Sequence, residues 1–129
     1  MSFILKQAAA ACAFATLAMI GVDAAAAEIK VTCEVGPTRS KISVDGKGLA
    51  AKTFTTVAIS GGNMATSLPE PSVAGEIETD YDSRPADIKA GAIAIPSTFI
   101  VGASVTGKIV NATGHTVIAD TVACRVRTK

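Results

Sequence analysis

Beta-branched residues dominate the chain beyond residue 27, where 34 of the 102 residues are Val, Ile or Thr. Leucine occurs in this region only as Leu49 and Leu68. Branched side chains fit a pleated sheet well and lose rotamer freedom in a helix. Ten glycines and five prolines interrupt the same region at short intervals, as a fold of many short strands requires. The composition therefore predicts an all-β domain.

Alternation of apolar and polar residues locates the strands, most clearly in residues 28–35, where every odd position is apolar or cysteine. Asp45 and Gly46 are interpreted as a turn. Pro85 near the start and Gly91 at the end predict one short helical turn over residues 84–90. Loops are expected at residues 68–71 and 111–115. Further strands are expected at residues 39–44, 53–60, 73–81, 92–95, 98–101, 104–110 and 116–127, the last with an irregularity near Asp120.

These strands predict a small immunoglobulin-like β-sandwich of about seven to eight strands, and a small closed β-barrel is the alternative architecture. Residues 87–91 (Asp-Ile-Lys-Ala-Gly) resemble the corner that precedes strand F of an immunoglobulin domain. The chain departs from that family because it lacks tryptophan and has no tyrosine at that corner. Its cysteines also lie on the first and last strands.

The first 27 residues have the layout of an export signal. Lys6 supplies a positive charge, residues 8–20 are apolar and uncharged, and residues 25–27 are alanines that suit cleavage before Glu28. A retained membrane anchor is the alternative, but the apolar run is short for a span, and no later run approaches the ~20 residues needed. We therefore expect a signal peptide at 1–27 and one exported domain at 28–129, in the periplasm or outside the cell.

Removal of the signal would take Cys12 away and leave Cys33 and Cys124. An even pair in a small exported domain predicts a disulfide, and separate buried thiols are the alternative. The bridge would close a loop of 92 residues between the first and last strands. The chain-entropy model assigns such a bridge about 4–5 kcal/mol of stability as an upper figure.

An acidic run is the most distinctive chemical feature. Glu76, Glu78, Asp80 and Asp82 occur at every second position, and an extended strand would place them all on one face. Two neighbours could share one cation, so a calcium site at Asp80 and Asp82 with help from Asp87 is a hypothesis. The alternatives are a solvated face that discourages edge pairing or a surface for a basic protein partner.

The remaining candidate ligands are His115 and Met64, which could bind copper only if the fold brought them together. His115 is the only histidine, so a multi-histidine metal site is excluded. A rigid catalytic base is not expected in the turn that contains His115. The formal net charge of +1 gives no electrostatic basis for nucleic-acid binding.

The sequence therefore predicts an exported, non-enzymatic β-sandwich module with a structural or protein-interaction role, its partner being another envelope protein. No catalytic residue and no required cofactor are assigned. An enzyme would need carboxylates such as Glu76 and Glu78 inside an enclosed cleft. The alternative functions are a calcium- or copper-binding periplasmic protein and a fimbrial-type subunit, since pilins are small bridged sandwiches that exchange strands.

Overall fold

The computed structural model describes residues 27–128, which form ten strands and one short helix. Three of the strands are only two residues long, so seven longer strands carry the fold. The elements are β1 (Glu28–Gly36), β2 (Arg39–Lys47), β3 (Thr53–Ser60), β4 (Asn63–Thr66), β5 (Glu70–Pro71), β6 (Ile77–Asp82), α2 (Pro85–Lys89), β7 (Ile93–Ala94), β8 (Ser104–Asn111), β9 (Thr116–Ala123) and β10 (Arg125–Val126).

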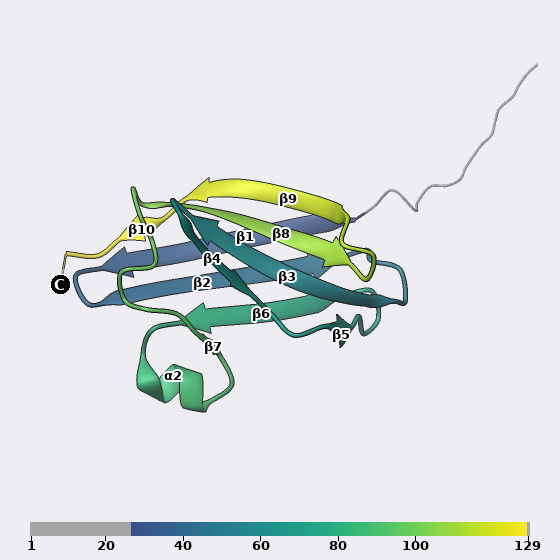
Figure 1. The fold of residues 1–129 in the computed structure, drawn as a ribbon, viewed down its shortest axis with the longest axis horizontal. Helices are drawn as coiled ribbons and strands as arrows, with labels where there is room; N and C mark the ends of the chain where they lie inside the picture. The colour runs from purple at the N-terminus through teal and green to yellow at the C-terminus, as the bar shows by residue number, and fades with distance from the viewer. Residues whose placement is uncertain (1–26, 129) are drawn as a thin grey trace, which may run out of the picture.

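The strands form two sheets that pack face to face (Figure 1). One sheet has the order β10-β1-β2-β6-β7, and the other has the order β4-β3-β8-β9, with β5 beside β3. The first, second and fifth of the longer strands share one sheet, and the third, fourth, sixth and seventh share the other. This is an immunoglobulin-like arrangement in which the fourth strand pairs with the third. Within residues 27–128 both sheets end in open edges, so the sandwich prediction is confirmed and the closed barrel is wrong.

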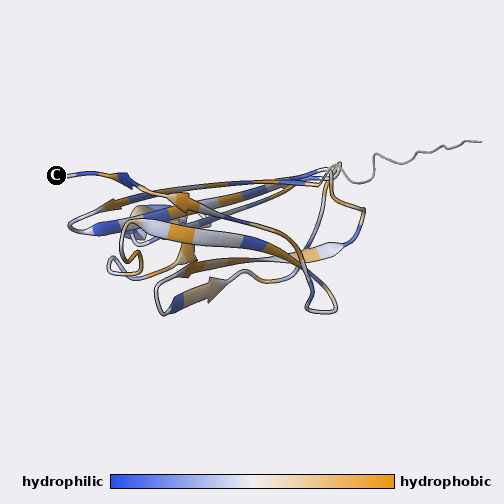
Figure 2. Ribbon diagram, turned by 90° about the horizontal axis from the view of Figure 1, so that it is seen from above, coloured by the Kyte–Doolittle hydropathy of each residue, from blue (hydrophilic) through white to orange (hydrophobic). Residues whose placement is uncertain are grey.

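The core lies between the sheets because inward and outward residues alternate along each strand. Figure 2 shows this alternation as apolar and polar bands that follow one another along the ribbons. Residue Gly107 of β8 is needed for close packing, since a Cβ there would lie 2.6 Å from a methyl group of Val31. The buried apolar residues are Val31, Cys33, Ile42, Val44, Leu49, Phe54, Ala58, Ile77, Tyr81, Ile95, Phe99, Ile100, Val105 and Ile109.

Several predicted boundaries are wrong. Asp45 and Gly46 continue β2 and pair with Lys30 and Ile29, because the long ladder with β1 overrides the local turn preference. Gly46 is buried against Ile109 and Ile77, where a side chain would collide. Strand β6 begins only at Ile77, because residues 73–76 form a tight turn.

The other corrections concern loops and strand ends. Residues 98–101 do not form a strand: they lie in a loop that ends in an isolated bridge between Val101 and Ser104. Residues 63–66 form β4, which was not predicted. Residues 70–71 pair as β5 within the predicted loop. The irregularity of β9 lies at Val117 and not at Asp120, since Ile118 pairs with Ile109 while Thr116 pairs with Val110. The short helix at residues 85–89 confirms the predicted helical turn.

The disulfide between Cys33 and Cys124 is present, with the sulfur atoms 2.12 Å apart. Cys124 lies between β9 and β10, where the chain leaves one sheet and joins the other beside β1. The bridge therefore ties β1 to this crossing. The predicted signal peptide lies, except for Ala27, outside the described residues and stays a prediction. Within residues 27–128 no helix combines the length and apolarity that a membrane span needs.

Candidate functional site

The four residues of the acidic run differ in exposure and in position relative to β6. Glu78 and Asp80 are exposed on the outer face of the sheet, whereas Ile77, Thr79 and Tyr81 point inward. Asp82 is only 2% exposed, so the expectation that it shares the exposed face is wrong. Glu76 precedes the strand, in the turn that begins at Val73. The predicted acidic face is therefore reduced on β6 to Glu78 and Asp80.

Asp82 is buried because Arg39 and the chain before α2 enclose its carboxylate. Arg39 donates through Nε to Oδ1 at 3.1 Å and through Nη2 to Oδ2 at 2.7 Å. The backbone amide of Arg84 donates to Oδ1 at 3.0 Å, and Arg39 also reaches Asp87 at 3.2 Å. Both oxygens of Asp82 are therefore engaged, which argues against the calcium site at Asp80 and Asp82.

The electrostatics of this ion pair follow from the same contacts. Burial acts to raise the pKa of Asp82, but the hydrogen bonds from Arg39 and from the amide of Arg84 outweigh it and hold the pKa below its ordinary value. The hydrogen bond to Asp82 raises the pKa of Arg39. The pair is thus fully charged near neutral pH and fixes the end of β6 to β2.

Part of β6 has an open edge. The amide of Ile95 donates to the carbonyl of Asp82 at 3.0 Å, so the backbone of Asp82 faces β7. Alternate residues of a strand direct their backbone groups to the same side, so those of Glu78 and Asp80 face this side too. In the parallel register of β6 and β7, Ile93 lies between Asp80 and Asp82 and its amide bonds to the carbonyl of Asp80. Within residues 27–128, no strand covers the amide of Asp80 or the amide and carbonyl of Glu78 on this side.

The open edge of β6 faces a groove of about 620 Å³, here called the β6 groove. Leu68, which is 83% exposed, belongs to the wall contributed by the segment between β4 and β5. Five carboxylates and a single lysine line the groove, which gives it an excess of negative charge. Its lining residues are Lys41, Ser67, Leu68, Pro69, Glu70, Glu78, Thr79, Asp80, Asp82, Asp87, Ala90, Gly91, Ala92 and Ile93.

Thr79 has a buried, unsatisfied hydroxyl beside the groove. It lines the groove between Glu78 and Asp80, is 7% exposed, and its Oγ1 has no hydrogen-bond partner among the described residues. Buried polar groups nearly always have a partner, and an unpaired one costs about 1–3 kcal/mol. A ligand in the groove could supply this missing partner.

Asp45 is a charged neighbour of the groove that the sequence interpretation missed. It pairs with Glu78 across the sheet, and its Oδ1 is buried without a hydrogen-bond partner. Burial raises the pKa of Asp45, and the charges of Glu78 and Asp80 add to this effect. The alternation of Ile42 and Val44 continues through Gly46, and extending that pattern would have identified Asp45 as a strand residue.

His115 and Met64 lie at opposite ends of one sheet. Met64 pairs with Ile59 near the end of β3, whereas His115 bonds to Asn111, which pairs with Phe54 at the beginning of β3. Five residues of extended strand separate these points by roughly 17 Å, so the two side chains cannot share a copper ion. Within residues 27–128, no three His, Cys, Asp or Glu side chains are grouped to hold a metal.

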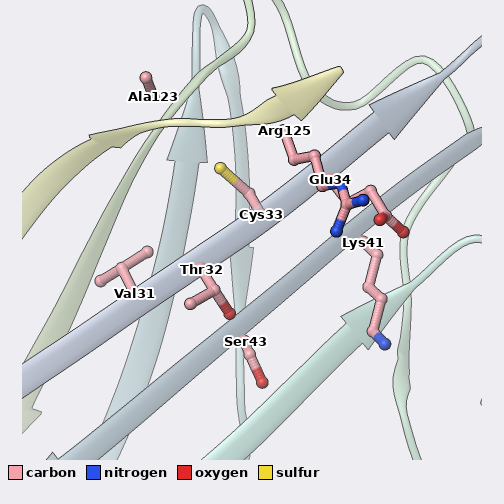
Figure 3. A pocket seen from close by; sticks show the side chains of 8 residues that line it. All are labelled: Val31, Thr32, Cys33, Glu34, Lys41, Ser43, Ala123 and Arg125. Atoms are coloured by element: carbon pink, nitrogen blue, oxygen red, sulfur yellow. The ribbon is translucent and has the colours of Figure 1, made fainter. Parts of the chain in front are cut away.

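A second hollow, of about 380 Å³, lies beside the disulfide (Figure 3). Figure 3 shows Thr32 and Ser43 side by side on β1 and β2, and Arg125 beside Glu34. The amide of Arg127 donates to the carbonyl of Val35 at 2.8 Å, so odd residues of β1 face β10. The parallel pairing of β10 with Glu34 and Val35 also uses the carbonyl of Cys33, so the edge of β1 is open at residues 29–32.

No family model matches the chain, and no curated protein sequence is significantly similar to it. Functional inference therefore depends on the geometry of the domain. The longest open edges of the described sheets are those of β1, β6 and β9. Among them, only β6 borders a groove that combines free backbone groups, an exposed leucine and an excess of carboxylates.

Proposed function

We propose that the protein is an exported, non-enzymatic module of the periplasm or cell surface that binds another envelope protein by accepting a strand. The observation that carries this proposal is the open edge of β6 inside the β6 groove. The bonded pair Cys33–Cys124 suits an oxidising compartment, and the pattern of residues 1–27 supports export.

Strand addition fits this edge physically. The partner's backbone would hydrogen-bond to the groups of Glu78 and Asp80 that face the groove, while the walls would select its side chains. The acidic groups favour binding over acid–base catalysis for two reasons. Glu78 and Asp80 are exposed and stand about 6.6 Å apart along a strand, and the buried carboxylate of Asp82 is held by Arg39.

Photo-crosslinking in intact cells tests this function. A photoreactive residue placed at Leu68, in the groove wall, should give a discrete adduct with one envelope protein. The same residue at Ala112, in the exposed turn between β8 and β9, is the matched control and should give none. Fractionation of the same cells should find the processed protein outside the cytoplasm. The absence of an adduct at Leu68, or equal adducts at both positions, would contradict the proposal.

A fimbrial-type subunit is a second candidate, favoured by the open edge of β1 beside the disulfide hollow. A subunit of that kind would accept a strand from its neighbour along residues 29–32 and so form a polymer. Unboiled, non-reducing gels of the envelope fraction would show a ladder of oligomers. A single monomer band in such gels would exclude this candidate.

A further inference from the structure

We infer that the segment entering the β6 groove is extended and basic, and that it carries Lys or Arg on both sides of a small hydroxyl residue. The inference rests on the proposed function, because it names the partner of the same site. Three independent features of the groove support it: the free backbone groups of β6, the charge of the lining side chains, and the unpaired hydroxyl of Thr79.

The backbone of β6 limits the length and shape of the occupant. Glu78 offers one amide and one carbonyl toward the groove, and Asp80 offers its amide, because its carbonyl is bonded to β7. An added strand could therefore form up to three hydrogen bonds. At one end β7 already pairs with Tyr81 and Asp82. At the other end the turn of residues 73–76 closes the strand. The open part therefore accepts about four extended residues, or roughly 13 Å.

The charges select a basic occupant. Arg39 neutralises Asp82 and also contacts Asp87, which Arg84 approaches at 3.8 Å. No ion pair to the other three lining carboxylates, those of Glu70, Glu78 and Asp80, occurs among residues 27–128. Residues directly opposite one another on neighbouring strands share a face of the sheet, and opposite charges there are favourable. Lys or Arg side chains opposite Glu78 and Asp80 would satisfy this requirement.

Thr79 specifies the residue between the two cations. Successive side chains of a strand alternate between faces, so the middle residue of the partner would point inward beside Thr79. A serine or threonine at this position can hydrogen-bond to the unpaired Oγ1. On the opposite wall, Leu68 and Pro69 offer apolar surface to the methylene stems of long basic side chains. The expected pattern is therefore basic, hydroxyl, basic.

The test is binding of a synthetic peptide of about eight residues with alternating Lys and Thr to the full domain. Titration calorimetry should show binding that weakens as salt shortens the Debye length to about 3 Å at 1 M. A peptide with alternating Glu and Thr should not bind. The double variant Glu78→Lys with Asp80→Lys should lose affinity for the basic peptide by about tenfold or more.

Matched variants separate groove binding from general charge. Glu76→Lys makes half of this charge change outside the groove and should bind the peptide as the wild type does. Thr79→Val keeps the shape and all charges but removes the hydroxyl. It should therefore weaken binding of the Lys-Thr peptide and leave binding of a Lys-Ala peptide unaffected. Circular dichroism and melting temperature verify that each variant is folded.

Hydrogen exchange tests the pairing itself. The amides of Glu78 and Asp80 should become protected when the peptide binds, whereas the exposed turn of residues 112–114 should not change. Three results would overturn the inference. The peptide could bind without protecting these amides, or Glu76→Lys could lose as much peptide affinity as the groove variant. The domain could also self-associate in place of binding the peptide. If crosslinking at Leu68 captures a partner while the basic peptide fails to bind, the proposed function stands and this inference alone is wrong.

Discussion

The hydroxyl groups of Tyr81 and Thr56 lie 2.6 Å apart in the centre of the core and join the two sheets. Tyr81 belongs to β6 and Thr56 to β3, and neither residue has any exposed surface. Burial raises the pKa of Tyr81 above its ordinary value, although the hydrogen bond with Thr56 opposes this effect. Among residues 27–128, each hydroxyl is the only side-chain partner of the other, so the pair behaves as one buried polar unit.

The first prediction concerns this pair. Tyr81→Phe would leave the buried hydroxyl of Thr56 without a partner, so we expect it to lower the free energy of unfolding by about 1–3 kcal/mol. Thr56→Val should lower the free energy of unfolding by a similar amount. The double variant should lower it by less than the sum of the two single changes, because no hydroxyl is left without a partner. Urea unfolding of the four proteins measures the coupling, and strictly additive losses would contradict it.

The second prediction concerns Arg39 and Asp82. The pKa of Asp82 is lowered in the folded protein. The stability it contributes is therefore complete above the unfolded value of about 3.9 and is lost as the pH falls through the folded value. Asp82→Asn should lower the free energy of unfolding near neutral pH by about 1.5–3 kcal/mol. Below about pH 4, the free energy of unfolding of this variant should fall less steeply with decreasing pH than that of the wild type. Glu76 is exposed, so Glu76→Gln is the control and should leave the pH dependence of the free energy of unfolding unchanged.

The third prediction concerns the disulfide. Replacing Cys33 and Cys124 together by alanine should lower the free energy of unfolding by up to about 4–5 kcal/mol, because the unfolded chain gains a long open loop. Urea midpoints measured with and without a reductant provide the test. The reductant should shift the wild type toward the variant and should not affect the variant. If full reduction does not change the urea midpoint of the wild type, the bridge contributes little to stability.

Local patterns predicted the strands well wherever burial follows a simple alternation. Residues 28–36 and 53–60 are bounded almost as expected, because each buries one face and leaves the other exposed. Asp45 and Gly46 were misread because turn propensity is local, whereas nine consecutive pairs with β1 decide the structure of β2. A turn signal inside an alternating segment is therefore weaker than the alternation around it.

The candidate site was only partly predictable for a related reason. Alternation correctly placed Glu78 and Asp80 outward, but Asp82 is buried by Arg39, which is 43 positions earlier in the chain. The groove depends on Leu68 and Pro69 approaching β6 from the other sheet. Contacts of this kind arise from the tertiary fold, and no periodicity within residues 76–82 encodes them.

The fourth prediction concerns Asp45, whose pKa is raised in the folded state by burial and by nearby carboxylates. The folded protein therefore holds this proton more tightly than the unfolded chain, and stability falls as the pH rises from the unfolded value of about 3.9 through the folded value. Asp45→Asn should raise the melting temperature at neutral pH, and the gain should disappear below about pH 4. A variant that melts at or below the wild-type temperature at neutral pH would contradict this.

The fifth prediction concerns Asp120, the only charged residue of β9. Within residues 27–128, β9 pairs with β8 alone and leaves its other edge open. Asp120 lies opposite Gly107, on the same side as Ile118 and Val122, whose partners Ile109 and Val105 are buried. Asp120 itself is exposed at this edge, and a charge on an edge strand discourages another strand from pairing there.

Asp120→Val would remove this protection and leave an open edge of eight uncharged residues with strong β propensity. We expect the variant to elute from a sizing column as larger species than the wild type at the same concentration, with the difference growing as concentration rises. Glu76→Val removes one carboxylate away from β9 and should elute as the wild type does. An Asp120→Val protein with the wild-type elution volume at every concentration would show that the edge of β9 is blocked by something other than this charge.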